Sequence, residues 1–167
     1  AWVALSQSHA NLLKPERCDA WTAYRLGEIL TMRNDPVSAS VYLKRAVDLV
    51  PGSSDFVLKL ALNEYRLSRR EGAMQRLQRL TDRDPDYVPA YANLGFMYLE
   101  SGQPQKADQC YNKALRLDPD HAPSLLNRIG LRIHQGQKKE ALRLLDDMLK
   151  RYPGDPRAMA LKKQINH

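Results

Sequence analysis

Hydrophobic residues recur along this chain with the spacing of α-helices. Between residues 88 and 100 four residues stand at i, i+3, i+4 and i+7, and so share one helical face: Tyr91, Leu94, Gly95 and Tyr98. Between residues 104 and 117 a second face is formed by Ala107, Tyr111 and Ala114. Gly102 can end the first helix with a positive φ, and Pro104 suits the first position of the next. The stretch therefore predicts a helical hairpin.

The hairpin pattern occurs four times. Proline recurs every 34 residues, at Pro51, Pro85, Pro119 and Pro153. Alanine recurs at the same interval, at Ala39, Ala73, Ala107 and Ala141. A fixed period of about 20 to 50 residues is typical of proteins built from stacked repeats. We therefore expect four repeats within a single domain of residues 1–167, at 20–53, 54–87, 88–121 and 122–155.

The segments on either side of the repeats also have helical spacing. Residues 2–13 place Trp2 and Leu5 on one face, which predicts the second helix of a preceding partial repeat within a longer array. Residues 156–166 place Leu161 on an apolar face beside polar positions. A capping helix needs such a face for the last repeat and a polar face for solvent.

The repeats resemble the tetratricopeptide repeat (TPR) family, whose 34-residue pattern is W-x2-L-G-x2-Y, then A-x3-F, a second small residue and P. The third repeat follows it with two aromatic exchanges, at Tyr91, Leu94, Gly95, Tyr98, Ala107, Tyr111, Ala114 and Pro119. The first repeat keeps Leu26 and Gly27, whereas the second is looser. The resemblance implies an all-α fold, a right-handed α-solenoid of four tandem TPR helix-turn-helix repeats with the two flanking helices.

The fourth repeat departs most from the family pattern. Arg128 and Arg132 occupy positions that are apolar in the family, and the local apolar face is formed by Leu126, Ile129 and Ile133. We therefore expect the first helix of this repeat to be rotated or shifted relative to the others.

The resemblance also implies a concave groove lined by the first helix of each repeat, where family members commonly bind their ligands. Repeats are numbered here from Ala20, Ser54, Val88 and Ala122, and the groove positions are the second, fifth, sixth, ninth and twelfth. The candidate binding residues are Tyr24, Glu28, Leu58, Leu62, Tyr65, Asn93, Phe96, Leu99 and Asn127. This set is mostly apolar, which favours a protein or peptide partner.

Two features of the groove refine the kind of ligand. Family members that capture acidic carboxyl-terminal tails use Lys, Asn and Arg at defined positions, which Tyr24, Glu28 and Leu58 do not supply. Asn93 and Asn127 stand one repeat apart, and an amide can both donate to and accept from a peptide backbone. One hypothesis is that these two residues clamp an extended peptide. The alternative is that their spacing is a coincidence and the apolar residues pack between helices or copies.

The sequence offers no pattern typical of an enzyme, a metal site or a cofactor site. It contains no GxGxxG, Walker-type loop or HExxH motif, and its histidines are scattered, at His9, His121, His134 and His167. We therefore expect no catalytic residues, no metal and no cofactor. No apolar run has the length of about 18 residues that a membrane span requires. The sequence does not specify a compartment, and both a cytoplasmic and a periplasmic location fit it.

The net charge of +7 leaves two alternative functions open. Residues 122–167 carry ten basic and four acidic side chains, so this end could meet an anionic surface. Nucleic acid is not favoured, because most aromatic residues fall at repeat-packing positions rather than among basic residues. Self-assembly into a homo-oligomer, through exposed repeat surface, is the other alternative.

Overall fold

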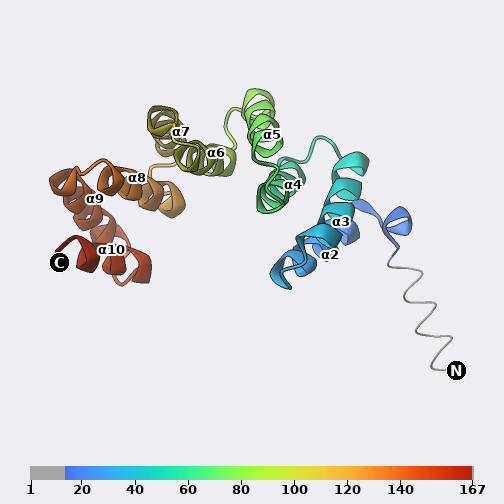
Figure 1. Cartoon of the computed structure of the whole chain (residues 1–167), viewed down its shortest axis with the longest axis horizontal. Helices are drawn as coiled ribbons and strands as arrows, with labels where there is room; N and C mark the ends of the chain where they lie inside the picture. The colour runs from blue at the N-terminus through green and yellow to red at the C-terminus, as the bar shows by residue number, and fades with distance from the viewer. Residues whose placement is uncertain (1–13, 167) are drawn as a thin grey trace, which may run out of the picture. The chain divides into compact units, whose positions relative to one another are not determined.

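The structure, a computed structural model, describes residues 14–166, and within them every regular element is a helix (Figure 1). The described elements are η1 (Pro15–Arg17), α2 (Ala20–Met32), α3 (Pro36–Leu49), α4 (Ser54–Arg66), α5 (Arg70–Arg83), α6 (Val88–Glu100), α7 (Pro104–Leu117), α8 (Ala122–His134), α9 (Lys138–Arg151) and α10 (Pro156–Asn166). The helix that the sequence predicts at residues 2–13 lies outside the described residues.

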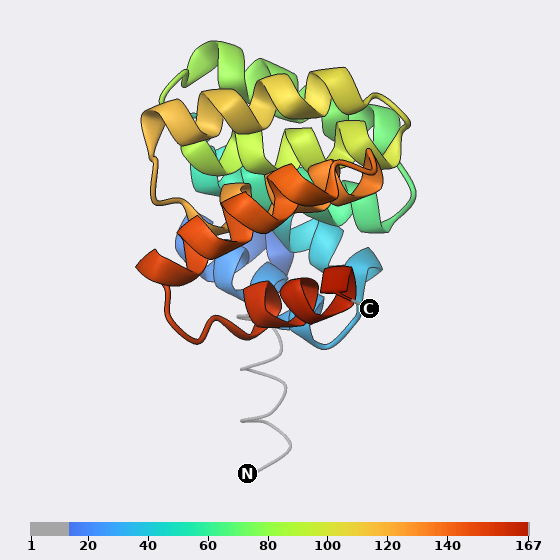
Figure 2. The same ribbon diagram turned by 90° about the vertical axis from the view of Figure 1, so that its left-hand side faces the viewer.

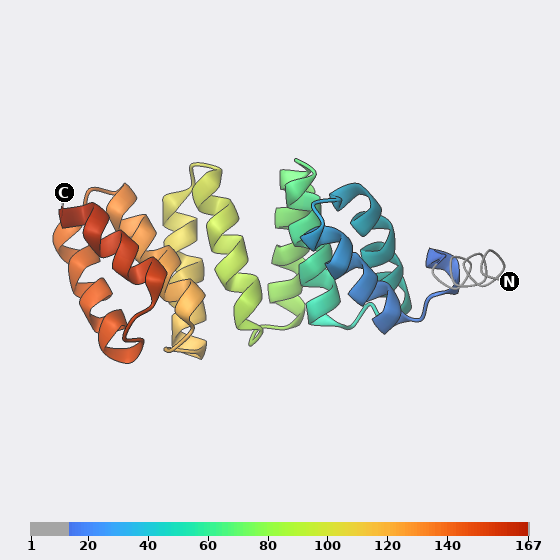
Figure 3. The ribbon, with the colours of Figure 1, turned by 90° about the horizontal axis from the view of Figure 1, so that it is seen from below.

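The helices pair into hairpins within two compact units, unit 1 up to Pro85 and unit 2 from Asp86. In unit 1, α2 packs on α3 and α4 packs on α5. In unit 2, α6 packs on α7 and α8 packs on α9. The last helix, α10, packs on α9 and also contacts α8, and Figures 2 and 3 show it in red beside the orange α9.

Each hairpin turn places the fifteenth residue of its repeat in the left-handed backbone region. The φ angles are 60° at Asn34, 61° at Ser68, and 71° at both Gly102 and Gly136. Glycine adopts this conformation freely, whereas a residue with a Cβ carries a strain of about 1 kcal/mol. The same turn is therefore built from three different residue types.

Side chains at the N-caps of several helices accept hydrogen bonds from backbone N–H groups. Asp19 accepts from Thr22 N at 3.0 Å at the start of α2, and Asp35 accepts from Ser38 N at 3.0 Å at the start of α3. At the start of α8 the acceptor is instead the Nδ1 atom of His121. These bonds satisfy donors that the helix itself leaves unpaired.

Small residues allow the two helices of a hairpin to approach closely. A Cβ added to Gly27 would lie 2.6 Å from Leu43 Cγ, and one added to Gly95 would lie 2.5 Å from Tyr111 Cε1. The alanines that recur every 34 residues are fully buried, at Ala39, Ala73, Ala107 and Ala141. Interiors are packed as densely as organic crystals, so these positions exclude larger side chains.

The expected rotation or shift of the fourth repeat is wrong. Helix α8 begins and ends 34 residues after α6, and four of its buried residues stand at the positions that are buried in α6. In α8 these are Ser124, Leu126, Ile129 and Leu131, and in α6 they are Ala90, Ala92, Gly95 and Met97. The helix therefore buries the same face as α6. Arg128 and Arg132 are accommodated by polar contacts and not by a rotation of the helix.

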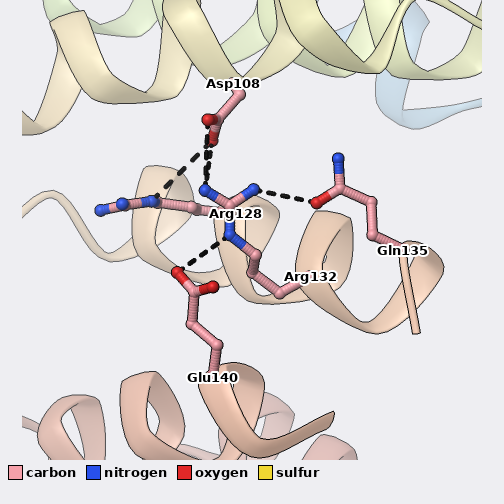
Figure 4. A network of polar contacts seen from close by, with 5 residues as sticks. All are labelled: Asp108, Arg128, Arg132, Gln135 and Glu140. Carbon is pink, nitrogen blue, oxygen red and sulfur yellow. Dashed lines mark hydrogen bonds and ion pairs between the residues drawn. The ribbon is translucent and has the colours of Figure 1, made fainter. Parts of the chain in front are cut away.

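Arg132, which is 9% exposed, is held by a network of polar contacts (Figure 4). Its Nη2 donates to Asp108 Oδ1 at 2.9 Å, and its Nε donates to Glu140 Oε1 at 3.1 Å. Its Nη1 donates to Gln135 Oε1 at 3.0 Å, while Arg128 Nε lies 4.0 Å from the same Asp108 carboxylate. A buried charge is tolerated when it is paired and hydrogen-bonded. Ion pairs to α7 and α9 therefore accommodate an arginine at the position where the third repeat carries Tyr98.

Candidate functional site

The predicted groove residue Glu28 of α2 is surrounded by hydrogen-bond donors. Its carboxylate receives Lys59 Nζ at 2.8 Å, Arg25 Nη1 at 3.0 Å and the Tyr24 hydroxyl at 3.1 Å. Burial pushes the pKa of Glu28 upward, but the hydrogen bond and charge of Lys59 and the other donors outweigh it, so the pKa is lowered. Burial and the Glu28 carboxylate raise the pKa of Tyr24 to about 12. Glu28 therefore stays ionised and paired at neutral pH.

The other predicted residues of unit 1 offer little open apolar surface. Leu58 is buried, with 8% of its surface exposed, and Leu62 and Tyr65 are half-buried. A hollow of about 450 Å³ between α2 and α4 is lined by Arg25, Glu28, Ile29, Thr31, Met32, Lys59 and Arg66. Of the predicted site residues, Glu28 alone reaches this hollow, whose lining is mixed, with four charged residues beside Thr31 and the apolar Ile29 and Met32.

Unit 2 contains a larger and more apolar pocket, of about 710 Å³. Three predicted residues line it: Phe96 and Leu99 from α6, and Asn127 from α8. Phe96 is 40% exposed, so an aromatic ring faces solvent at this place. The structure thus brings together three of the nine predicted residues in one concave site.

The two predicted asparagines have unequal positions. Asn127 lines the pocket, and its Nδ2 donates to the backbone oxygen of Ala92 in α6 at 3.5 Å. Asn93 is not among the residues that line the pocket, and its Nδ2 donates to Pro89 O of its own helix at 2.8 Å. Each amide nitrogen therefore already bonds to the protein backbone.

Sequence reasoning missed the pocket residues outside the first helices. Arg157, Ala160, Leu161 and Gln164 of α10 form one wall, and Tyr111 of α7 contributes from below α6. The apolar stripe of α10 was assigned only to packing on the last repeat, although α10 also contacts α8. Part of this stripe lines the pocket as well as packing on the last repeat. The sequence alone does not show this, because it depends on where α10 lies relative to α6 and α8.

Tyr111 is a buried side chain with an unsatisfied polar atom. Its hydroxyl is buried and has no hydrogen-bond partner within the described part of the chain. Burial raises the pKa of Tyr111 above its usual value, so this hydroxyl stays protonated and available as a donor. A buried unpaired hydroxyl costs free energy, and such groups often mark a place where a bound molecule completes the bonding.

The described residues contain no cluster suited to binding a metal ion. Among them, no three His, Cys, Asp or Glu side chains gather where they could hold a metal ion. His121 serves as a helix cap, and burial lowers its pKa despite the nearby Asp118 charge. Residues 14–166 also include no helix with both the length and the apolar character needed to cross a membrane.

Comparison with solved structures supports the fold. TTC0263, a thermophilic TPR protein of Thermus thermophilus, superimposes with a TM-score of 0.78 over 88% of this chain and 81% of that one, at 21% identity. The TPR protein YrrB, described as having an unusual peptide-binding site, matches with a TM-score of 0.70 over 86% of this chain and 74% of that one, at 20% identity. These similarities confirm the predicted all-α helical solenoid.

Sequence comparison leads to the same family. Superkiller complex protein 3 of Mus musculus is 31% identical over 101 residues, which are 60% of this chain but only 6% of the mouse protein. The chain thus spans a small part of that relative's length. A family model for the tetratricopeptide repeat matches residues 20–95 and 98–165, which together make up most of the chain. The chain therefore belongs to the tetratricopeptide repeat family.

Proposed function

We propose that the chain is a non-catalytic interaction module that binds a protein or peptide partner on the groove face of its first helices, chiefly in the pocket of unit 2. The supporting observation is that Phe96, Leu99 and Asn127 line one concave site of about 710 Å³. Sites that take ligands are typically apolar hollows of about 300 to 1,000 Å³ with a few polar groups that set orientation. This pocket has that size and character.

A peptide suits the chemistry of the pocket better than a small polar molecule. The Phe96 ring and Leu99 offer contact to apolar side chains, and large aromatic anchors dominate the energetics of most interfaces. The Asn127 amide oxygen can accept a backbone N–H from an extended segment. The family and fold are typical of scaffolds that bind proteins or peptides, and YrrB is itself described by a peptide-binding site.

A substitution at Phe96 tests the proposal. Peptides are selected from a random library on the full chain, and their dissociation constants are measured by fluorescence anisotropy. Phe96→Glu places a charge in the apolar site, and we expect binding to weaken by at least about tenfold, or ~1.4 kcal/mol. Met159→Glu is the matched control, since Met159 of α10 is 54% exposed and does not line the pocket.

Two results would count against this function. Equal binding by the wild-type chain and Phe96→Glu would remove the pocket as the site. Peptides whose affinity falls steeply with salt and that bind through the basic residues of 122–167 would favour the anionic-surface alternative.

Self-assembly is the second candidate function, and an apolar patch in the first hairpin favours it. Val37 and Val41 of α3 are exposed by 67% and 51%. At the same two positions the later repeats carry only polar residues, which are Glu71 and Gln75, Gln105 and Gln109, and Lys139 and Arg143. Sedimentation across a concentration series should show association that the double variant Val37→Glu/Val41→Glu abolishes. A chain that stays monomeric throughout the series would rule this candidate out.

A further inference from the structure

The ninth position of the repeat carries a large side chain in three repeats and none in the fourth. These residues are Glu28, Leu62, Phe96 and Gly130. Gly130 lies inside α8, four residues before its end at His134, and it lines the pocket of unit 2. The absence of a side chain at this position enlarges the pocket next to the Phe96 ring.

Helix packing does not explain Gly130. A Cβ added to Gly27 or Gly95 would collide with a neighbouring side chain, but one added to Gly130 would meet nothing within 4 Å. No positive φ is found at Gly130, so the backbone does not require glycine either. Glycine is the poorest helix former after proline, so an unneeded glycine in a helix interior lowers stability. The remaining effect of Gly130 is the space that it leaves open.

The surroundings of this space are apolar at the walls and polar at the rim. Phe96 and Leu99 of α6 face Leu161 of α10 across the pocket. Tyr111 also lines it, and the Tyr111 hydroxyl is one of the buried polar groups that have no hydrogen-bond partner in residues 14–166. At the rim, the Arg157 guanidinium lies 3.2 Å from Asp155 and is mostly exposed. An occupant with an apolar group would pack against the walls, and a hydrogen-bond acceptor on it would bond to the Tyr111 hydroxyl.

The pocket itself is lined by one acidic and one basic side chain, Glu100 of α6 and Arg157 of α10, whereas the region around it has an excess of positive charge. From Ala122 onward the chain has ten basic and four acidic side chains, and this region supplies α8 and α10, two of the helices that wall the pocket. Complementary charge raises the rate of encounter and discriminates against wrong partners more than it adds affinity. An apolar anchor with a carboxylate on the side of Arg157, away from Glu100, is therefore favoured over one flanked by basic residues.

We propose that the space left by Gly130 is a socket for one bulky apolar side chain of a partner segment that carries acidic residues beside this anchor. The inference rests on the proposed function and specifies its ligand. The anchor packs between Phe96, Leu99 and Leu161, while an acceptor close to the anchor takes the hydrogen bond of the Tyr111 hydroxyl. The flanking carboxylates lie at the rim near Arg157.

Filling the socket tests this inference. A phage-displayed library of random peptides is panned on the full chain and counter-selected against Gly130→Leu, whose side chain occupies the space. We expect clones specific for the wild-type chain to carry a bulky apolar residue with Asp or Glu nearby. Synthetic copies should bind Gly130→Leu at least about tenfold more weakly than the wild-type chain. Gly130→Ala, which adds one methyl group, should have an intermediate effect.

Two further variants keep the test independent of folding. The melting temperature of Gly130→Ala should be equal to or above that of the wild-type chain, so any loss of binding is not a loss of structure. Tyr111→Phe removes only the hydroxyl, and it should weaken the selected peptides by about threefold, the effect of one hydrogen bond. Unchanged binding by Tyr111→Phe would overturn the role given to the hydroxyl.

The outcomes separate this inference from the proposed function. If selected peptides bind Gly130→Leu as well as the wild-type chain but lose binding to Phe96→Glu, the socket is wrong and the groove function stands. If selected peptides lack acidic residues, the charge requirement is wrong. If sedimentation shows that the wild-type chain dimerises and that Gly130→Leu does not, the occupant is a second copy of the chain. The proposal of an acidic partner segment is then wrong. If no peptide is enriched, the proposed function fails as well.

Discussion

The ninth repeat position is filled in opposite ways in the first repeat, which lies in unit 1, and in the fourth, which lies in unit 2. In unit 1 Glu28 holds Lys59 at 2.8 Å and Arg25 at 3.0 Å, in a hollow of about 450 Å³ that four charged residues line together with Ile29, Thr31 and Met32. In unit 2 Gly130 leaves room beside Phe96, in an apolar pocket of about 710 Å³. The helices that carry these two residues, α2 and α8, are equal in length and begin at the same repeat position. The side chain at this position, together with the wall that α10 adds in unit 2, therefore distinguishes the two hollows.

We expect an apolar ligand to prefer the pocket of unit 2 to the hollow of unit 1. An apolar ligand over Glu28 would have to displace water from an ionised carboxylate and its partners, which costs free energy without a new bond. The same ligand over Gly130 covers apolar surface and removes it from water, which is favourable. Of these two hollows, we therefore expect the pocket of unit 2 to be the more favourable for apolar anchors.

The largest expected effect on stability concerns the eleventh position of the repeat. One repeat in each unit carries a buried charge there, Glu64 in unit 1 and Arg132 in unit 2. Arg132→Ala in unit 2 leaves Asp108 and Glu140 without their common partner and should lower the free energy of unfolding by about 3 kcal/mol. Glu64→Ala in unit 1, which removes the two 2.8 Å bonds to Arg76, should act in the same direction. Urea denaturation followed by circular dichroism measures both losses.

An exposed arginine supplies the control for this prediction. Arg157→Ala should change stability by less than about 0.5 kcal/mol, because solvent screens its pair with Asp155. A loss below about 1 kcal/mol for Arg132→Ala would mean that the network adds little to the stability of unit 2.

The next effect separates the two kinds of glycine. Gly27→Ala in unit 1 forces a Cβ to within 2.6 Å of Leu43 Cγ and should destabilise the chain by about 1 to 3 kcal/mol. Gly130→Ala in unit 2 meets no atom within 4 Å and should stabilise it by about 0.5 to 1 kcal/mol. Thermal and urea unfolding compare the variants. Two changes of the same sign would contradict the distinction between a packing glycine and a glycine that leaves space.

The smallest effect concerns pH. Burial lowers the pKa of His121 in the folded chain, so the ring that caps α8 is neutral. Its stabilising contribution is lost as the pH falls below about 6.5, the pKa of histidine in the unfolded chain. In unit 1, hydrogen bonds from Thr22 and Ser38 lower the pKa values of the caps Asp19 and Asp35. The contribution of these carboxylates is present above about pH 4 and is lost only below it.

Amide hydrogen exchange measures this difference in each helix separately. Between pH 7.5 and pH 5.5, protection at the start of α8 should fall by up to about 1 kcal/mol, while α2 and α3 should keep theirs. His121→Asn, which replaces the ring by a non-titrating cap, should remove the change. Equal losses in both units would show that the pH response does not come from His121.

The fold followed from the sequence because its determinants are local and periodic. Gly95, Ala107 and Tyr111 stand at fixed spacing, so one repeat predicts the packing of the next. The family and the all-α helical solenoid are confirmed on this basis. The fourth repeat was misjudged because Arg132 was read as a break in the apolar face, although its pairing with Asp108 and Glu140 lets the helix keep its phase.

The candidate site was only partly accessible from the sequence. Phe96, Leu99 and Asn127 were named from their repeat positions, and their role in binding stays a prediction. Gly130 stood among the groove positions, but whether it packs or leaves space depends on its neighbours. The wall formed by Arg157 and Leu161 has no signal in the repeat pattern.

The sequence by itself determined the repeat, its helices and the small residues that bring them together, because each depends on residues a few turns apart. Only the tertiary structure decided which glycine is open, which arginine is paired, and that α10 closes one side of the pocket with Tyr111 at its base. Those properties depend on distances between side chains from different helices. A periodic pattern along one chain does not contain such distances.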